Sequence, residues 1–165
     1  LIAQAICHEN MAFVLVPHLS RDHESLLPEI LRRISKLKIM RIENEMLIEP
    51  CRLYVLPPGY YARVVEDKLY LDLRPNRGIN LSANVLFKSL AEFYGKNAIG
   101  VVLSGAAVGS DGSEGVVAIK EQDGHTYAQA PSTAEYPEMP EAAIRTGCID
   151  SVLGAEQIGH ELTLV

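Results

Sequence analysis

The feature that most constrains this chain is residues 98–130, which predict a strand, a glycine-rich loop, a helix and a second strand in that order. Residues 98–103 form a short, almost wholly apolar run with paired valines, typical of a parallel strand covered on both faces. The loop at 104–112 is rich in glycine, which allows backbone angles closed to other residues. A helix from about Ser113 and a strand at 126–129 complete the unit, so we expect an α/β fold.

A single carboxylate, Asp111, stands in that loop. Open α/β sheets usually build their sites in loops that follow the carboxyl ends of the strands. Asp is also among the best N-cap residues, and the helix near Ser113 follows at once. On this stretch alone, helix capping is favoured over catalysis. Phosphate binding is only weakly indicated, because the loop has neither the GK[ST] arrangement nor the GxGxxG spacing.

His18 occupies the corresponding place after another apolar run, MAFVLV at residues 11–16. A lone histidine in such a place is more often an ordinary loop or core residue than a catalyst. If the two strands are parallel neighbours, however, His18 and Asp111 lie at the same edge of the sheet. The sequence therefore offers an imidazole and a carboxylate as a candidate pair.

The rest of the chain alternates helices and strands around one β-rich interruption. Short strands and turns between residues 38 and 73 predict an antiparallel hairpin insertion. A helix capped by Asn80 or Ser82 and closed by Gly95 leads into the central unit. We therefore expect one domain, residues 1–165, with a doubly wound, mainly parallel sheet flanked by helices. The other expected elements are a helix ending near Ile34, a short helix at 141–145, a strand at 149–153 and a helix at 155–162.

Composition excludes several functional classes. The 165 residues, 48% of them apolar, suffice for one ordinary domain with a core. A net charge of −6 argues against nucleic-acid binding, which needs a clustered basic face. The one basic cluster, at residues 32–38, fits the solvated side of a helix. No apolar run approaches the roughly 20 residues of a membrane span.

The cysteines and the first residues give two further expectations. Cys7, Cys51 and Cys148 are far apart and form no CxxC pair, so we expect reduced thiols and no zinc site. Residues 1–7 have no initiator Met and look like the middle of a helix, so an upstream segment is expected. A signal peptide is not indicated, because the basic n-region is missing.

Five blocks of the sequence stand out together: MAFVLVPHLSRDHESLL at 11–27, CRLYVLPP at 51–58, VLFKSLAEFY at 85–94, AIGVVLSGAAVGSDGSEG at 98–115 and YPEMPEAAIRTG at 136–147. In this order they resemble the catalytic domain of the chemotaxis receptor protein-glutamate methylesterases, the CheB family. The segments HLSRDHESLL and TAEY are closest to versions fused to a receptor methyltransferase.

The resemblance implies a serine esterase that hydrolyses glutamate methyl esters on chemoreceptors, with glutamine deamidation as a second activity. His18 would be its general base and Asp111 the carboxylate that orients the imidazole, which agrees with what a serine hydroxyl needs in order to attack an ester. Val108 and Gly109 match the loop that helps to hold the oxyanion. Tyr136 and Met139 are candidates for the substrate site.

The resemblance also marks what this chain lacks. The family serine lies in a Gly-x-Ser-x-Gly-Gly loop after the first strand, which would precede Leu1, and no segment here has that pattern. The loop at 104–112 is longer than the family's, and AQAP at 128–131 lacks the family's acid. This chain alone is therefore expected to be nearly inert. Four serines lie near the edge of the sheet where His18 and Asp111 are expected, but none of them lies on a nucleophile elbow: Ser20, Ser104, Ser110 and Ser113.

The resemblance also sets expectations for partners and location. The substrates would be methylated chemoreceptor helices, with a fused methyltransferase or receiver domain as a further partner. We expect a cytoplasmic protein without nucleic acid, membrane insertion, metal or organic cofactor, since acyl transfer requires only the triad and the oxyanion donors. The alternative is a catalytically silent relative that serves as a regulatory or binding module in a sensory multidomain protein.

Overall fold

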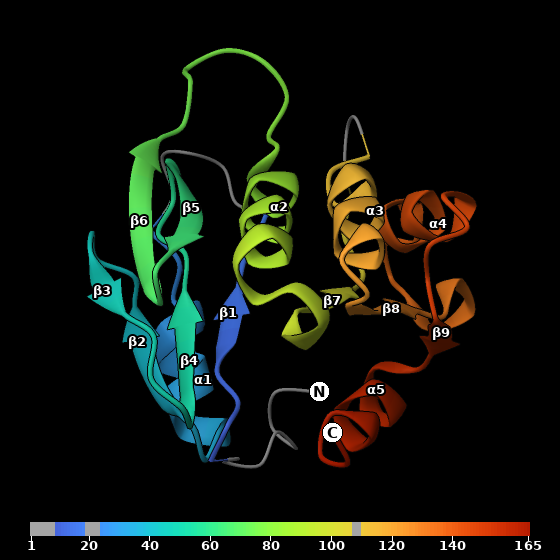
Figure 1. Cartoon of the computed structure of the whole chain (residues 1–165), viewed down its shortest axis with the longest axis horizontal. Helices are drawn as coiled ribbons and strands as arrows, with labels where there is room; N and C mark the ends of the chain where they lie inside the picture. Colours follow the sequence, from blue (N-terminus) through green and yellow to red (C-terminus); the bar gives the residue numbers. More distant parts are fainter. Residues whose placement is uncertain (1–8, 19–23, 107–109) are drawn as a thin grey trace.

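The computed structural model describes residues 9–18, 24–106 and 110–165 of the chain. Over these ranges it has three three-stranded sheets, two parallel and one antiparallel, with helices packed against them. Helix α2 lies in the middle of the molecule, with the first two sheets on one side and the third on the other (Figure 1). The expected α/β class with parallel strands flanked by helices is confirmed.

The first parallel sheet has the strand order β1-β4-β2. It consists of β1 (Phe13–Leu15), β4 (Arg52–Val55) and β2 (Lys38–Arg41). Helix α1 (Leu27–Ile34) begins with a proline in its first turn, where the missing N–H does little harm. The helix packs on this sheet through a buried apolar cluster that consists of Leu31, Leu37, Ile39, Leu53 and Val55.

The antiparallel sheet has the order β3-β6-β5. It consists of β3 (Met46–Leu47), β6 (Lys68–Leu73) and β5 (Tyr60–Val65). The turn residues Glu66 and Asp67 both have positive φ, at 49° and 59°, as a tight two-residue hairpin requires. The predicted hairpin is therefore present.

The antiparallel part is smaller than the predicted insertion at residues 38–73. Strands β2 and β4 lie within that range but pair in parallel with each other and, through β4, with β1. Turn residues reveal a hairpin locally, whereas the pairing of strands that are distant in sequence leaves no local signal. The sequence pattern therefore located these strands but not their partners.

The second parallel sheet has the order β7-β8-β9. It consists of β7 (Ile99–Val102), β8 (His125–Gln129) and β9 (Ser151–Leu153). Three helices pack against it: α3 (Ser113–Glu121), α4 (Glu138–Arg145) and α5 (Ala155–Glu161). The described chain also has two short 3₁₀ helices, Gly95–Asn97 and Pro131–Thr133.

Helix α2 (Ser82–Tyr94) joins the two halves of the molecule. Its Leu86 belongs to the cluster over the hairpin, while Phe87 packs in the cluster with α3 and β7. The two helices approach closely at Gly115, where an added Cβ would lie 2.5 Å from the Cβ of Phe87. Glycine at this position therefore sets the distance between α2 and α3.

A groove separates the two parallel sheets. Among the described residues, β1 pairs with β4 alone and β7 with β8 alone, so each presents a free edge. Both strands line a groove of about 750 Å³ together with apolar side chains of α2. The strands that precede His18 and Asp111 are therefore not direct neighbours, because the groove lies between them.

The described helices and cysteines bear on two predictions made from composition. Within the described ranges, none of the helices is long and apolar enough for a membrane span. Cys148 is a free thiol, and Cys7 lies outside the described residues.

Candidate active site

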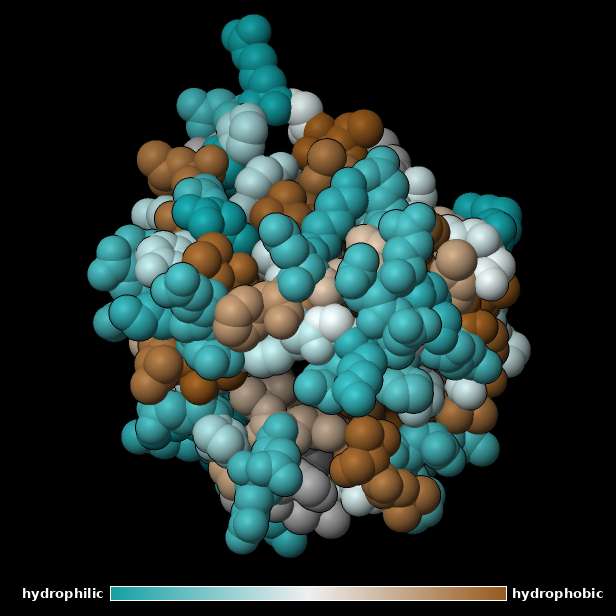
Figure 2. Space-filling view, in the orientation of Figure 1, coloured by the Kyte–Doolittle hydropathy of each residue, from teal (hydrophilic) through white to brown (hydrophobic). Residues whose placement is uncertain are grey.

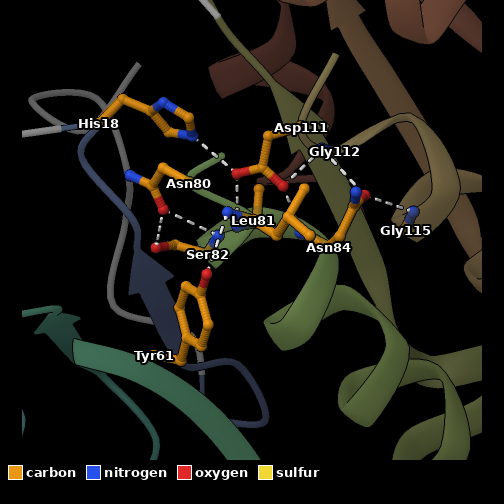
Figure 3. Close-up of polar contacts among 10 residues, drawn as sticks. His18, Tyr61, Asn80, Leu81, Ser82, Asn84, Asp111, Gly112 and Gly115 are labelled. Atoms are coloured by element: carbon orange, nitrogen blue, oxygen red, sulfur yellow. Dashed lines mark hydrogen bonds and ion pairs between the residues drawn. The ribbon is translucent and has the colours of Figure 1, made fainter. Parts of the chain in front are cut away.

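His18 lies just beyond the carboxyl end of β1, three residues after Leu15. Its Nε2 lies 2.6 Å from Oδ2 of Asp111, in the loop between β7 and α3 (Figure 3). The imidazole is 17% exposed, and the carboxylate is fully buried. The two side chains therefore meet at one rim of the molecule, although their strands belong to different sheets.

Asp111 is held by the start of α2. Its Oδ2 accepts the backbone N–H of Ala83 at 2.8 Å, and its Oδ1 accepts the N–H of Asn84 at 2.8 Å and of Gly112 at 3.0 Å. A carboxylate at a helix N-terminus satisfies donors that have no partner within the helix and lies at the positive end of the helix dipole. Asp111 therefore caps α2 across the fold, instead of capping α3 as the sequence suggested.

Asn84 caps the start of α3, as Asp111 caps the start of α2. Its side-chain Oδ1 accepts the backbone N–H of Gly112 and of Gly115, each at 2.9 Å, and the residue is only 4% exposed. The loop before α3 therefore caps α2, and α2 caps α3. Because each helix start holds the other, the carboxylate of Asp111 is fixed in position and direction.

A second layer of hydrogen bonds supports the start of α2. The side-chain oxygen of Asn80 accepts the backbone N–H of Ser82 at 3.1 Å and also its hydroxyl. The hydroxyl of Tyr61, on β5, accepts the N–H of Leu81 at 3.5 Å. Asn80 thus takes part in the helix start as expected, while Asp111 receives the N–H groups of the next two residues.

The segment directly after β7, which leads toward Asp111, is held by hydrogen bonds to other parts of the fold. Ser104 donates its N–H to the side chain of Gln129 and accepts the N–H of Tyr136, both at 2.9 Å. Gly105 donates its N–H to the carbonyl of Tyr136 at 2.9 Å, and an added Cβ there would lie 2.5 Å from Sδ of Met139. The loop is therefore clamped onto the segment that precedes α4.

The remaining candidate residues have different positions. Tyr136 is half exposed. Met139 is 9% exposed and belongs to the core cluster under α2, so it supports the loop from below. Val108 and Gly109 lie outside the described residues, so their expected part in the oxyanion loop stays a prediction.

Sequence reasoning missed the residues that hold Asp111, above all Asn84. Its two hydrogen-bond partners lie 28 and 31 residues away, so it forms no local motif. The only available signal was an asparagine in the first turn of a helix, a residue type that competes for backbone hydrogen bonds. Backbone N–H donors such as that of Ala83 carry no side-chain signal at all.

The arrangement has the chemistry of a general base. A buried carboxylate that accepts the N–H of an imidazole fixes its tautomer and stabilises the imidazolium that forms when the ring takes a proton. Within the described residues, the imidazole of His18 has Asp111 as its one hydrogen-bond partner, and no cluster of metal ligands is found. The described site therefore holds a proton acceptor without a nucleophile bonded to it.

A family model and several known proteins are similar to this chain in sequence. A family model described as CheB methylesterase matches residues 2–162. The protein-glutamate methylesterase/protein-glutamine glutaminase 1 of Carboxydothermus hydrogenoformans is 33% identical over 160 residues, covering 90% of this chain and 45% of that protein. An uncharacterised 104.1 kDa protein of Rhodobacter capsulatus is 36% identical over 133 residues, which cover 81% of this chain and 14% of that protein.

A solved structure is also similar. The crystal structure of the Thermotoga maritima CheB methylesterase catalytic domain matches with a TM-score of 0.83 and 26% identity, covering 99% of this chain and 90% of that chain. The chain thus spans less than half of the two longer relatives and nearly all of this catalytic domain.

Proposed function

Because this chain belongs to the CheB methylesterase family, we propose that it forms most of a serine esterase that hydrolyses glutamate methyl esters on chemoreceptors and deamidates their glutamines. His18 is the general base, and Asp111 orients it. The observation that carries this proposal is the 2.6 Å contact between the imidazole and a buried carboxylate that three backbone N–H groups hold in place.

In this proposal the two ring nitrogens of His18 have different tasks. Nε2 faces Asp111 and donates its proton there, so Nδ1 is the nitrogen that accepts a proton from the serine hydroxyl. The serine oxygen attacks the ester carbonyl, and the imidazolium returns the proton to the departing methoxide, which leaves as methanol. Water then hydrolyses the acyl-enzyme, with the same nitrogen as base.

The nucleophile, in this proposal, comes from a further strand that fills the groove between β1 and β7. Within the part of the chain that the structure describes, both flanking strands have free edges there, and the groove is lined by their apolar side chains and by those of α2. A strand parallel to β1 would end at the same rim as His18, so a loop after it would bring a serine to the imidazole. Without that loop the chain is nearly inert, since loss of the nucleophile costs about a millionfold in turnover.

The partners and location follow from the same proposal. The substrates are methylated cytoplasmic helices of chemoreceptors, so the protein acts in the cytoplasm. A fused methyltransferase or receiver domain is a further proposed partner, supported by the similar Rhodobacter capsulatus protein, of which this chain covers only 14%. The larger protein, and not this segment, is therefore the object to assay.

The test is methanol release from methylated receptor by the full-length protein. We expect turnover by the wild type and a loss of at least about a thousandfold in His18→Ala. The matched control is His160→Ala, which removes an exposed histidine of α5 that does not line the groove. Equal rates for the wild type and His18→Ala would contradict the proposal.

The second candidate is a silent regulatory module. It is favoured by one observation, that the imidazole of His18 contacts no hydroxyl within the described residues. Labelling of the full-length protein with a serine-directed phosphonate separates the two candidates. Labelling that disappears in His18→Ala excludes the silent module, and absence of labelling excludes the esterase.

A further inference from the structure

An exposed apolar surface lies where β6 leads into α2. We name residues 73–81 the β6–α2 rim. Three of its side chains are large, apolar and exposed: Leu73 by 72%, Ile79 by 52% and Leu81 by 39%. Figure 2 shows hydrophobic patches beneath a protruding hydrophilic side chain at the top of the molecule, where Figure 1 places the loop between these two elements.

The rim is fixed to the catalytic pair. At its start, Arg74 donates its backbone N–H to the carbonyl of Gly59 at 2.9 Å. At its end, Leu81 donates its N–H to the hydroxyl of Tyr61 and immediately precedes α2, whose N-terminal N–H groups hold Asp111 (Figure 3). The Leu81 end of the rim therefore adjoins the helix start that holds Asp111, the partner of His18.

The charge of the rim is opposite to that of the chain. The chain has a net charge of −6, yet the rim contains Arg74 and Arg77 and no acidic residue. Neither guanidinium pairs with a carboxylate among the described residues, whereas the nearby Arg63 is paired with Asp72 at 2.8 Å. The rim thus combines apolar surface with two cations available to a partner.

We propose that the β6–α2 rim binds the acidic, amphipathic helix that carries the ester. This inference rests on the proposed function and names its mode of substrate recognition. The apolar face of the substrate helix packs on Leu73, Ile79 and Leu81, and its glutamates pair with the two arginines. A neutral or basic helix lacks the second set of contacts, so the rim selects segments dense in glutamate.

The test uses two synthetic helical peptides and the full-length protein. One peptide is rich in glutamate and carries a single glutamate γ-methyl ester, and the other has its remaining glutamates replaced by glutamine. We expect a lower KM for the acidic peptide, and we expect added salt to reduce this difference because Arg77 is exposed and Arg74 is only partly buried. Methanol release measured against peptide concentration gives KM and kcat separately.

Variants then test the surface itself. Arg74→Gln/Arg77→Gln is expected to raise the KM for the acidic peptide about 3- to 10-fold, and to raise the KM for the neutral peptide less. Ile79→Ser is expected to raise the KM for both peptides. The matched control is Arg32→Gln/Arg33→Gln, which removes the same charge from α1, on the far side of the first sheet from the rim (Figure 1).

The outcomes separate this inference from the proposed function. If the wild type hydrolyses both peptides and the rim variants keep its full preference for the acidic one, the rim inference fails alone. If the wild type hydrolyses neither peptide, the proposed function fails first. Dimerisation that Ile79→Ser abolishes, with unchanged KM values, would assign the rim to a second copy of the chain and overturn the inference.

Discussion

At the scale of single residues, Asp111 performs two tasks with one carboxylate. It accepts the imidazole N–H of His18 and also caps α2 through Ala83 and Asn84. The sequence presented these tasks as alternatives, because N-capping and orienting a base both need a carboxylate after a strand. The structure shows that they coincide, since the helix that Asp111 caps is not the one that follows it.

Substitution of Asp111 should therefore affect activity and stability together. In Asp111→Asn one oxygen becomes an NH₂ group, which faces either the imidazole or a backbone N–H. We expect turnover in the full-length protein to fall about 10³- to 10⁴-fold, and the free energy of unfolding to fall by about 1–3 kcal/mol. Methanol release and urea unfolding measure the two effects.

The comparison variant is His18→Ala. It removes the base but leaves the three backbone hydrogen bonds of Asp111 in place, so we expect a similar loss of turnover with a smaller loss of stability. Equal destabilisation by both variants would contradict the capping role of Asp111.

Asn84 gives a second residue-scale expectation. Asn84→Ala leaves the N–H groups of Gly112 and Gly115 without their acceptor, and should cost about 2 kcal/mol of stability. Asn84→Asp retains the acceptor but adds a carboxylate beside Asp111, so a partial loss is expected. Asn80→Ala is the matched control, because it removes an asparagine acceptor from the more exposed side of the same helix start. Urea unfolding of all three variants provides the measurement, and equal losses for Asn84→Ala and Asn80→Ala would contradict the assignment.

At the scale of elements, the close contact between α2 and α3 determines where the two helix starts meet. The sequence pattern predicted both helices and the hairpin, because apolar periodicity and turn residues are local. It did not reveal which residue sets the distance between the helices. Gly115 looked like one of several loop glycines, and only the packing against Phe87 distinguishes it.

Gly115→Ala tests this contact, because helix propensity and close packing predict opposite changes in stability. In an open helix position, alanine is more stable than glycine by about 1 kcal/mol. Here the added Cβ would lie 2.5 Å from the Cβ of Phe87, so overpacking should dominate and destabilise the protein by about 1–3 kcal/mol. Gly154→Ala is the control, since its Cβ would lie 3.4 Å from the side chain of Gln157. Thermal unfolding shows whether the variant is less or more stable than the wild type, and stabilisation by Gly115→Ala would contradict the close contact.

A second element-scale feature joins α3, β8 and the segment before β9. Asp150 pairs with Lys120 at 2.8 Å and accepts the N–H of Thr126, which is fully buried, at 2.8 Å. Partial burial alone would raise the pKa of the Asp150 carboxyl, but the hydrogen bonds from Lys120 and Thr126 and the charge of Lys120 together lower it below its usual value. The ionised form therefore stabilises the fold.

The sign of the pH dependence follows from this lowered pKa. A carboxyl whose pKa is lower in the folded state contributes stability above its unfolded pKa of about 3.9, and loses it as pH falls through the folded value. The stability difference between the wild type and Asp150→Asn should therefore be full near neutral pH and shrink below about pH 4. Urea unfolding at several pH values measures it, and a difference that stays constant with pH would contradict the role of the charge.

At the scale of the whole molecule, the two parallel sheets are joined by α2 and separated by the groove. The alternation of strands and helices was enough to predict the fold class, and two strand ends were enough to predict the candidate pair. Strand adjacency was not predictable, because pairing depends on what lies between β1 and β7 in space. The meeting of His18 and Asp111 does not require adjacency, since both loops lean onto the start of α2.

Because of the groove, we expect this chain alone and the full-length protein to differ in dye binding and in amide exchange. Free strand edges leave backbone N–H groups unpaired, and exposed apolar side chains bind hydrophobic dyes. We therefore expect the chain alone to bind 8-anilinonaphthalene-1-sulfonate, and the amides at the edges of β1 and β7 to exchange with solvent rapidly. In the full-length protein the proposed strand pairs with both edges, so dye binding should fall and these amides should become as protected as those of β4, which is already paired on both sides. Hydrogen exchange resolved by residue measures this, with β9, an edge strand away from the groove, as the internal control. Unchanged exchange at β1 and β7 would show that the nucleophile reaches His18 by a route other than a strand in the groove.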